Sequence, residues 1–321
     1  MNFRQLGAFV AVYEEGSFSR AAARLNATQS GLSMQIRNLE GALGLAVFER
    51  TAKGVIPTYA GERLYQRAVD ILRQISATGA KMQTIAHGIS GHLRLGLMPT
   101  FTRGALAPAL SGFVADFPNV QVSVVEAYSA VLTEQVAAAE IDFAIVPKAA
   151  PRQGLRTRYL GTDRELLVCR AGGPLTHLAP VRLADLPPLR LVLPGRGNAR
   201  RDALEAYAEM HGVRIVALID MDAMIATLEF VANSEWVTIL PTTICVNDLD
   251  GSVRSLHPLV RPSLTVDYAV IEPAKRALSA PASLFLDRLR LHLREIDARW
   301  AGILRRRAPA RSGRAASHRI G

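Results

Sequence analysis

The sequence predicts an α/β protein that begins with a separate, all-helical segment. Apolar residues recur at helical spacing over about the first ninety positions, and from Gly91 onward short apolar runs alternate with helical stretches. Charge divides the chain in a similar way. Residues 1–90 carry ten lysines and arginines against six acids, residues 91–298 carry 21 against 22, and the last 23 residues carry seven arginines and no acid. The basic ends, rather than the neutral centre, are therefore predicted to meet a polyanion.

Composition excludes several classes of protein. With 321 residues, 49% of them hydrophobic, the chain can bury a core and is expected to hold two or three domains. It has no apolar run of about 18 residues, which a membrane span requires, and its N-terminus MNFRQLGAFVAVYEEG has no signal-peptide cleavage site. Cys169 and Cys245 lie in apolar surroundings, which favours buried thiols over a disulfide or a metal site. We expect a cytoplasmic protein with no metal and no cofactor.

Two short helices are predicted at the start of the chain. The first ends at Gly16, and Ser17 is suited to cap the second. A turn over residues 26–28 then leads to a third helix. The apolar positions are Leu6, Phe9, Val10 and Tyr13 in the first helix and Phe18, Ala21, Ala22 and Leu25 in the second.

The third helix has two unlike faces. In TQSGLSMQIRNLE, residues 28–40, Leu32, Ile36 and Leu39 share one face and a polar stripe lies opposite. On an isolated helix such a stripe is ordinarily a solvated surface. Here the preceding helix, the tight turn and the basic local charge favour a helix-turn-helix, whose second helix enters the major groove of DNA. The predicted DNA contacts on this helix are Thr28, Gln29, Ser30, Ser33, Met34 and Arg37.

The chemistry of these side chains suits base and phosphate contacts. Gln29 can pair bidentately with adenine, the two serines can reach a base or a phosphate, and Arg37 can reach a phosphate or guanine. After the third helix, GLAVFERTAKGVIPT holds two β-prone runs with Arg50 and Lys53 near the tip. These runs are interpreted as a wing, which lays cations along the phosphate backbone.

Residues 1–65 resemble the winged helix-turn-helix of the LysR-type transcriptional regulators. The resemblance rests on SFSRAAARL, ATQSGLSMQIRNLEGALG, VFER and PTYAG, and it implies sequence-specific binding of double-stranded DNA. Met34 departs from the family pattern, which often has arginine there. Base reading is therefore expected to depend on Gln29 and Ser30, with Met34 in apolar contact with a thymine methyl group. We assign residues 1–58 to this domain.

A long linker helix is predicted over residues 59–88. Thr58 is suited to cap it, and the apolar spacing alternates between four and three, as in a coiled coil, until His87 and Gly88. The helix could pack on its own domain, but a dimerising coiled coil is favoured, because it would set two recognition helices in successive major grooves. The resemblance implies the same dimer and often a tetramer. The seam residues are Leu64, Ala68, Ile71, Ile75, Thr78, Met82 and Ile85.

From Gly91 onward the alternation of strands and helices indicates βαβ units, a largely parallel sheet and two subdomains. The resemblance implies the family's effector domain, of type 2 periplasmic-binding-protein-like architecture, in which the chain crosses into the second subdomain near Thr162 and returns near Leu264. Accordingly, residues 91–162 and 265–304 are assigned to effector subdomain 1 and residues 163–264 to effector subdomain 2. Residues 305–321 are predicted to form a basic, disordered tail.

A small-molecule site is expected beyond the carboxyl ends of the strands, where helix N-termini present free N–H groups. Hydroxyl and amide groups there would suit a small carboxylate or another anion, with Arg103 or Arg196 supplying charge. Each residue alone is more often a helix cap than a ligand contact. The predicted effector-binding residues are Thr100, Phe101, Thr102, Arg103, Ser129, Arg196 and Asn198.

Two alternative functions belong to other classes. RLVLPGRGNARRDALEAYAEMHGVRIVALID, residues 190–220, is close to a dinucleotide-binding fingerprint with Asp220 as the ribose-binding acid, which would indicate an NAD(P)-dependent oxidoreductase. Arg200 stands where the third glycine belongs, which disfavours that function. The other alternative is a small-molecule-binding protein with a basic helical extension. The sequence has no GxSxG motif, P-loop or HxxxH pair, so we expect a regulator and not an enzyme.

Overall fold

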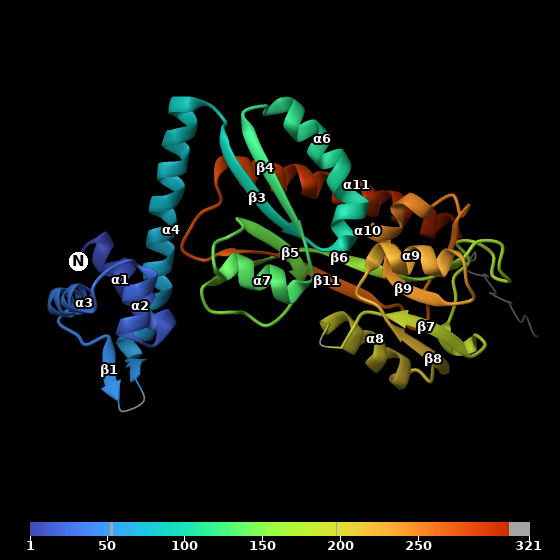
Figure 1. Cartoon of the computed structure of the whole chain (residues 1–321), viewed down its shortest axis with the longest axis horizontal. Coiled ribbons are helices and arrows are strands. Elements are labelled where there is room, and N and C mark those ends of the chain that lie inside the picture. The colour runs from blue at the N-terminus through green and yellow to red at the C-terminus, as the bar shows by residue number, and fades with distance from the viewer. Residues whose placement is uncertain (52–53, 197, 308–321) are drawn as a thin grey trace, which may run out of the picture. The chain divides into compact units, whose positions relative to one another are not determined.

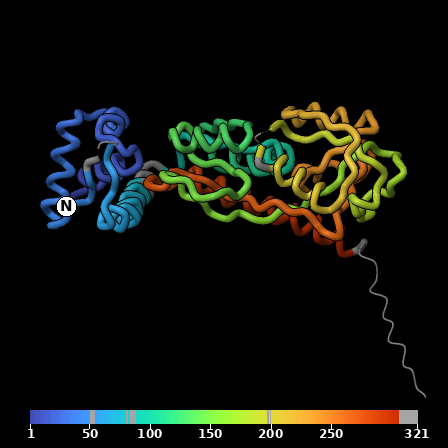
Figure 2. The backbone as a smooth tube through the Cα atoms, turned by 90° about the horizontal axis from the view of Figure 1, so that it is seen from below, coloured from blue at the N-terminus to red at the C-terminus, as the bar shows by residue number. Residues whose placement is uncertain are grey.

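The computed structural model describes residues 1–51, 54–196 and 198–307. The chain divides into two compact units, called unit 1 and unit 2 below. Unit 1 comprises Met1–Met98, Leu110–Leu160 and Tyr268–Arg288, and unit 2 comprises Pro99–Ala109, Gly161–Asp267 and Leu289–Gly321. Figure 1 labels the elements, and Figure 2 follows the backbone from the N-terminal helices (blue) through the long helix α4 (cyan).

Unit 1 begins with three helices whose ends follow from local capping. They are α1 (Phe3–Glu15), α2 (Phe18–Arg24) and α3 (Gln29–Leu43). The Ser17 hydroxyl caps α2, and the Thr28 hydroxyl caps α3. Gly16 and Gly44 end α1 and α3 with left-handed backbone angles, which glycine adopts without steric cost. The end of α1 at Gly16 and the cap at Ser17 agree with the sequence prediction.

The three helices and the start of α4 surround one apolar core. α1 packs against α2, α3 and α4, and Phe9, Val10, Ala21 and Leu39 are fully buried. The small side chain of Ala21 lets α1 and α2 approach closely. The wing follows as β1 (Phe48–Thr51) and β2 (Gly54–Pro57), two antiparallel strands in which Arg50 lies opposite Val55.

The linker helix α4 spans Tyr59–His87. The Thr58 hydroxyl accepts a hydrogen bond from the Gly61 amide at 3.0 Å and donates one to the Ala46 carbonyl at 2.8 Å. The residue that begins α4 is therefore also bonded to the loop before the wing.

The rest of unit 1 is a sheet with helices. Its strands lie in the order β4-β3-β5-β11, where β3 is parallel to β4 and β5 and β11 is antiparallel to β5. Phe113 and Phe285 meet edge to face, with ring centroids 5.2 Å apart, and so join helix α6 to the first part of α11. The elements are β3 (Gly91–Leu97), α6 (Ala107–Asp116), β4 (Val120–Glu126), α7 (Ser129–Ala137), β5 (Phe143–Pro147), β11 (Thr265–Pro273) and α11 (Ala280–Arg307).

Unit 2 holds the second part of the sheet, in the order β6-β9-β7-β8, with β10 paired to β6. β7 is parallel to β8 and β9, whereas β6 is antiparallel to β9 and β10. The elements are α5 (Pro99–Phe101), the π-helical turn η1 (Thr102–Leu106), β6 (Leu155–Arg170), η2 (Leu183–Asp185), β7 (Leu189–Leu193), α8 (Ala199–Met210), β8 (Ile215–Asp220), α9 (Met224–Ala232), β9 (Val237–Pro241), α10 (Thr242–Cys245), η3 (Val246–Asp248) and β10 (Arg254–Pro258).

The sheet is more mixed than the sequence pattern predicted. β6, β10 and β11 all make antiparallel pairs, because these strands are not each joined to a neighbour by a helical crossover, which a parallel pair requires. The prediction of a largely parallel sheet was therefore wrong for these strands. The sequence analysis also predicted only the second half of β6. In the first half, LRTRY, arginines alternate with uncharged residues and there is no apolar run.

Two segments that were assigned to effector subdomain 1 belong to unit 2 instead. Pro99–Ala109 belongs to unit 2, where Gly104 packs directly against the backbone of Thr243. The end of α11 also belongs to unit 2, because Trp300 is buried there among Leu166, Leu228 and Leu240. The predicted disordered tail, residues 305–321, was wrong for residues 305–307, which form the end of α11. From position 308 onward the tail lies outside the described residues.

Candidate DNA interface and effector domain

Helix α3 presents a polar face to solvent. Leu32, Ile36 and Leu39 are buried on one side. On the other side Met34 is 53% exposed, and Ser33 is half-buried. Thr28, Gln29, Ser30 and Arg37 of the predicted DNA-contact set are also exposed, and Asn38 is exposed beside them. The helix therefore offers short hydrogen-bonding groups, one thioether and one cation, which is the chemistry that a major groove admits.

The start of α3 is held by its own side chains. The Thr28 hydroxyl accepts from the Gly31 amide at 3.1 Å, and the Ser30 hydroxyl donates to Thr28 at 3.4 Å. The Ser19 hydroxyl of α2 donates to Gln29 Oε1 at 3.1 Å. This bond uses the carbonyl oxygen of the Gln29 amide. Ser19 on α2 therefore orients the side chain that is predicted to contact a base.

The wing is attached to α3 through Glu40, a residue that the sequence reasoning missed. Glu40 Oε1 accepts from the amides of Val47 and Phe48 at 2.9 and 3.4 Å. A carboxylate near a helix end gives no pattern from which this role could be inferred. Arg50 lies on β1, and Lys53 lies outside the described residues.

A second missed carboxylate, Glu14, joins four elements of unit 1. It contacts Arg24 at 2.9 Å, the Tyr65 hydroxyl at 3.1 Å and Lys275 at 2.9 Å. Its own side chain is 6% exposed. Burial and the neighbouring Glu14 charge raise the pKa of Tyr65 far above its usual value, so this hydroxyl stays protonated and donates to the carboxylate. The cluster links α1, α2 and α4 to the segment after β11.

Glu272 is the centre of a second cluster of ion pairs, which joins α4 to the sheet. Its side chain is fully buried, and it contacts Arg73 at 2.8 Å, Arg158 at 2.9 Å and Arg156 at 3.5 Å. Arg73 belongs to α4, and the other two arginines belong to β6. A buried carboxylate requires such partners, because an unpaired charge would be strongly destabilising there.

The predicted seam of the linker helix divides into two parts. Leu64, Ala68 and Ile71 pack against the core of the N-terminal helices, as the alternative of a helix packed on its own domain required. Ile75 and Met82 are 39% and 55% exposed. Among the seam residues whose side chains the structure describes, Ile75 and Met82 are the exposed apolar ones that a partner helix could cover.

The predicted effector residues of the Pro99–Arg103 stretch all belong to unit 2. Thr100 and Phe101 are buried, and the Thr102 hydroxyl donates to the Pro99 carbonyl at 3.2 Å. Arg103 forms an ion pair with Asp248 at 2.8 Å and donates to the Ile244 carbonyl. The charge of Arg103 is therefore already compensated within unit 2.

The N-terminus of α8 is partly occupied by side chains of unit 2. Asn198 Oδ1 accepts from the Arg200 amide at 3.0 Å and so caps the helix. The Gly195 amide donates to Asp222 at 2.9 Å. Arg196 is exposed. Of the two expected effector cations, Arg196 thus remains directed to solvent while Arg103 has an internal role.

Ser129 lies in unit 1 as the first residue of α7. The residue before it, Tyr128, occupies the cap position and provides no side-chain cap. The first turn of α7 is therefore without a capping side chain, and its carbonyl at Ser129 accepts from Thr133 at 2.6 Å.

The residues of the dinucleotide-like segment have other partners. Asp220 pairs with Arg201. Arg200, at the third glycine position, is buried and makes a bidentate ion pair with Glu165 at 2.9 and 2.7 Å. The Asp220 carboxylate is thus paired with a cation, which disfavours its use as a hydrogen-bond acceptor for a ribose hydroxyl.

The two cysteines are free thiols. Burial raises the pKa of Cys169 to about 11 and raises the pKa of Cys245 well above its usual value, which keeps both thiols protonated. Within the part of the chain that the structure describes, no three metal-binding side chains cluster, and no helix has the length and apolar character to span a membrane.

Together, the two helices joined by a tight turn, the exposed polar face and the wing define a DNA-binding protein of the winged helix-turn-helix class, followed by an α/β domain. Residues 3–62 match the model of the bacterial regulatory helix-turn-helix protein, lysR family, and residues 86–294 match the LysR substrate binding domain. The chain belongs to the LysR family of transcriptional regulators.

Similar proteins agree with this assignment. The nitrogen assimilation regulatory protein nac of Escherichia coli (strain K12) is 28% identical over 284 residues, which cover 88% of this chain and 92% of that protein. OxyR of Corynebacterium glutamicum has a similar solved structure, with a TM-score of 0.56, 20% identity and coverage of 94% and 97%. CbnR in complex with its target DNA has a TM-score of 0.51 and 23% identity, with coverage of 91% and 99%. The relatives are named as transcriptional regulators, and the chain is a regulator rather than an enzyme.

Proposed function

We propose that this LysR-family regulator reads its DNA site through the exposed face of α3 and responds to a small anionic effector. The observation that carries the first part is the division of α3 into a buried apolar face and an exposed polar face. Gln29 and Ser30 would contact base edges, Met34 a thymine methyl group, and Arg37 a phosphate or guanine. Thr28 and Ser33 would add contacts at the start of the helix.

The wing would provide contacts that do not depend on sequence. Arg50 and Lys53 flank its tip in the sequence, where their cations would lie along the phosphate backbone. Because such contacts release counterions from DNA, their contribution falls as salt rises. Helix α3 would thus provide sequence-specific affinity, and the wing would provide affinity for DNA of any sequence.

The dimer would form along the second half of the linker helix. Ile75 and Met82 are apolar, exposed and seven residues apart, which places them on one face of α4. In a dimer, the two α3 helices would enter half-sites about one helical turn, or a multiple of it, apart.

The proposed effector contacts in unit 2 are Thr100, Thr102 and the N-terminus of α8 with Arg196 and Asn198. Ser129, at the start of α7, is the proposed contact in unit 1. Helix N-termini favour anions, which supports a small carboxylate as the ligand class. Arg103 would act indirectly, since its ion pair with Asp248 holds the turn that carries Thr102. Phe101 would support that turn from within. We place the protein in the cytoplasm, where its DNA is.

The test is footprinting on the DNA that flanks the protein's own gene, with and without a panel of small carboxylic acids. We expect a protected region of two half-sites and a change in its extent with one class of acid. Equal affinity for that DNA and for a shuffled sequence would contradict the DNA-reading proposal. A footprint that no acid in the panel alters would contradict the effector proposal alone.

A further inference from the structure

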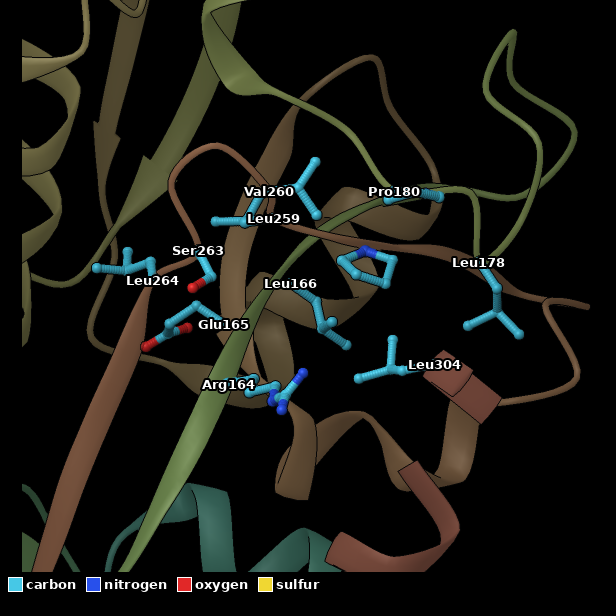
Figure 3. Close-up of a pocket in the computed structure, with 11 residues that line it drawn as sticks. Arg164, Glu165, Leu166, Leu178, Pro180, Leu259, Val260, Ser263, Leu264 and Leu304 are labelled. Atoms are coloured by element: carbon cyan, nitrogen blue, oxygen red, sulfur yellow. The ribbon is translucent and has the colours of Figure 1, made fainter. Parts of the chain in front are cut away.

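Unit 2 contains a pocket of about 250 Å³ that none of the proposed effector residues lines. Figure 3 shows it beside the strand β6 and the last turns of α11. Its walls are mainly aliphatic, and Leu166, Leu178, Pro180, Leu259, Leu264 and Leu304 form most of them. All of these residues belong to unit 2, so the pocket is complete within that unit.

The pocket exists because β10 ends early. Pro258, the last residue of β10, lies opposite Leu166 of β6, and the chain then leaves the sheet until Glu165 donates its amide to the Leu264 carbonyl at 2.9 Å. The intervening loop is firmly bonded, since the Val260 amide donates to the Val181 carbonyl at 2.9 Å. A loop with satisfied backbone groups and apolar side chains leaves a stable concave surface rather than a frayed edge.

Two charged residues line the pocket, and only one of them has its charge compensated. Glu165 is 3% exposed and bonded bidentately to Arg200. Arg164 is exposed, and no ion pair joins it to another residue of the described part of the chain. In Figure 3 the guanidinium of Arg164 lies beside Leu166 and Leu304, while the Glu165 carboxylate points the opposite way. The aliphatic walls therefore have one uncompensated cation at their edge.

We propose that this pocket binds a small amphiphilic monocarboxylate, with its hydrocarbon part against the leucines and its carboxylate paired with Arg164. A guanidinium and a carboxylate form charge-assisted, often bidentate hydrogen bonds. A phosphate or dicarboxylate would need more cations than the pocket offers, and an organic cation would be repelled by Arg164. The volume lies just below the roughly 300 Å³ at which pockets for drug-sized ligands begin, so the ligand is small.

The direct test is isothermal titration of the full-length protein with octanoate. We expect saturable binding of one octanoate per chain and none of acetate, which has the charge without the hydrocarbon part. Arg164→Gln should weaken octanoate binding at least tenfold, whereas Arg190→Gln, which alters an exposed arginine of β7 outside the pocket, should leave it unchanged. Leu304→Phe should also weaken it, because the larger side chain fills the pocket.

A second readout locates the ligand. Trp300 packs in the same apolar cluster as Leu166 and Leu178, so binding should change tryptophan fluorescence with the same midpoint as the titration. Absence of saturable binding by folded wild-type protein would overturn the proposal. Equal weakening by Arg164→Gln and Arg190→Gln would show general attraction to positive charge and would also overturn it. Loss of octanoate binding in Thr100→Val but not in Arg164→Gln would assign the ligand to the proposed effector site instead.

Discussion

Glu14 and Lys275 form an ion pair at 2.9 Å although 261 positions separate them in the sequence. Glu14 lies near the end of α1, the first helix of the DNA-binding domain, and Lys275 follows β11 of the sheet in unit 1. The same carboxylate also holds Arg24 and Tyr65. One side chain thus connects the DNA-binding helices and the linker helix to the α/β part of unit 1.

The first prediction concerns this connection. Lys275→Met should leave the DNA-binding helices folded, because Arg24 still compensates the Glu14 charge. The free energy of unfolding should fall by more than the roughly 1 kcal/mol of an exposed surface pair, since the Glu14 carboxylate is buried. Effector-free DNA binding should persist, while the effector-dependent change in footprint should diminish. Lys148→Met, at an exposed lysine of unit 1, is the matched control. A full effector response in Lys275→Met would show that the pair does not couple these parts.

The second prediction concerns base reading by α3. Gln29→Ala should weaken binding to the specific site by about 1–3 kcal/mol while leaving non-specific binding nearly unchanged, since it removes base contacts only. Ser19→Ala should cause a smaller loss of the same kind, because Ser19 orients the Gln29 amide. Gel-shift titrations on operator and random DNA measure both effects.

Two comparisons make the Gln29 result interpretable. Gln66→Ala, on an exposed position of α4, should change neither affinity. Arg50→Ala should weaken binding to every sequence and reduce the slope of log affinity against log salt by about 0.9 for each lost phosphate contact. If Gln29→Ala left discrimination between operator and random DNA intact, α3 would not be the recognition helix.

The third prediction separates the two parts of the linker seam. Ile75→Asp with Met82→Asp should dissociate the dimer without unfolding the chain, since both side chains are exposed in one chain and would meet like charges across the seam. Ile71→Asp should instead destabilise the DNA-binding domain, because Ile71 packs against its core. Sedimentation velocity and thermal melts distinguish the outcomes. An unaltered dimer in the double variant would place the interface elsewhere.

The fourth prediction concerns the proposed effector site. Thr100→Val retains the shape of a buried side chain and removes its hydroxyl, so effector binding should weaken by about 1–3 kcal/mol if that hydroxyl donates to the ligand. DNA binding without effector should be unaffected. Thr227→Val, at another buried threonine of unit 2, serves as the control. A normal response of Thr100→Val over the whole effector titration would indicate that the effector binds at Arg196 and Asn198 instead.

The fifth prediction concerns acid stability. His257 is fully buried, and burial lowers its pKa below the usual value. In the neutral ring, Nδ1–H donates to the Ala179 carbonyl at 3.3 Å and Nε2 accepts from the Ser255 hydroxyl at 2.9 Å. The unfolded chain therefore takes up a proton near pH 6.5 that the folded chain resists. Stability from this residue is complete above that pH and is lost as the pH falls below it.

The measurement is chemical denaturation between pH 7.5 and 5.5. The free energy of unfolding of the wild type should fall, with His257 contributing up to about 1.4 kcal/mol per pH unit, and His257→Asn should fall less steeply. Parallel curves for the two proteins would mean that His257 titrates alike in both states.

Features that depend on neighbouring residues could be predicted from residue patterns alone. Ser17 and Thr58 were recognisable as caps, because a cap bonds to amides within three residues of itself. The two faces of α3 followed from helical spacing alone. The family motifs within residues 1–65 are equally local, which is why the DNA-binding class could be predicted before any fold was known.

How distant charges pair could be seen only in the folded chain. No spacing in the sequence relates Glu14 to Lys275 or Glu272 to Arg73, since each pair forms where separate elements meet. The structure likewise showed that Arg103 is bound to Asp248 and that, among the described seam residues, Ile75 and Met82 are the exposed apolar ones. Hydrophobic periodicity identifies a buried face but not what covers it, because apolar contact has no directional preference. Partners for charges and for apolar faces are therefore decided by packing.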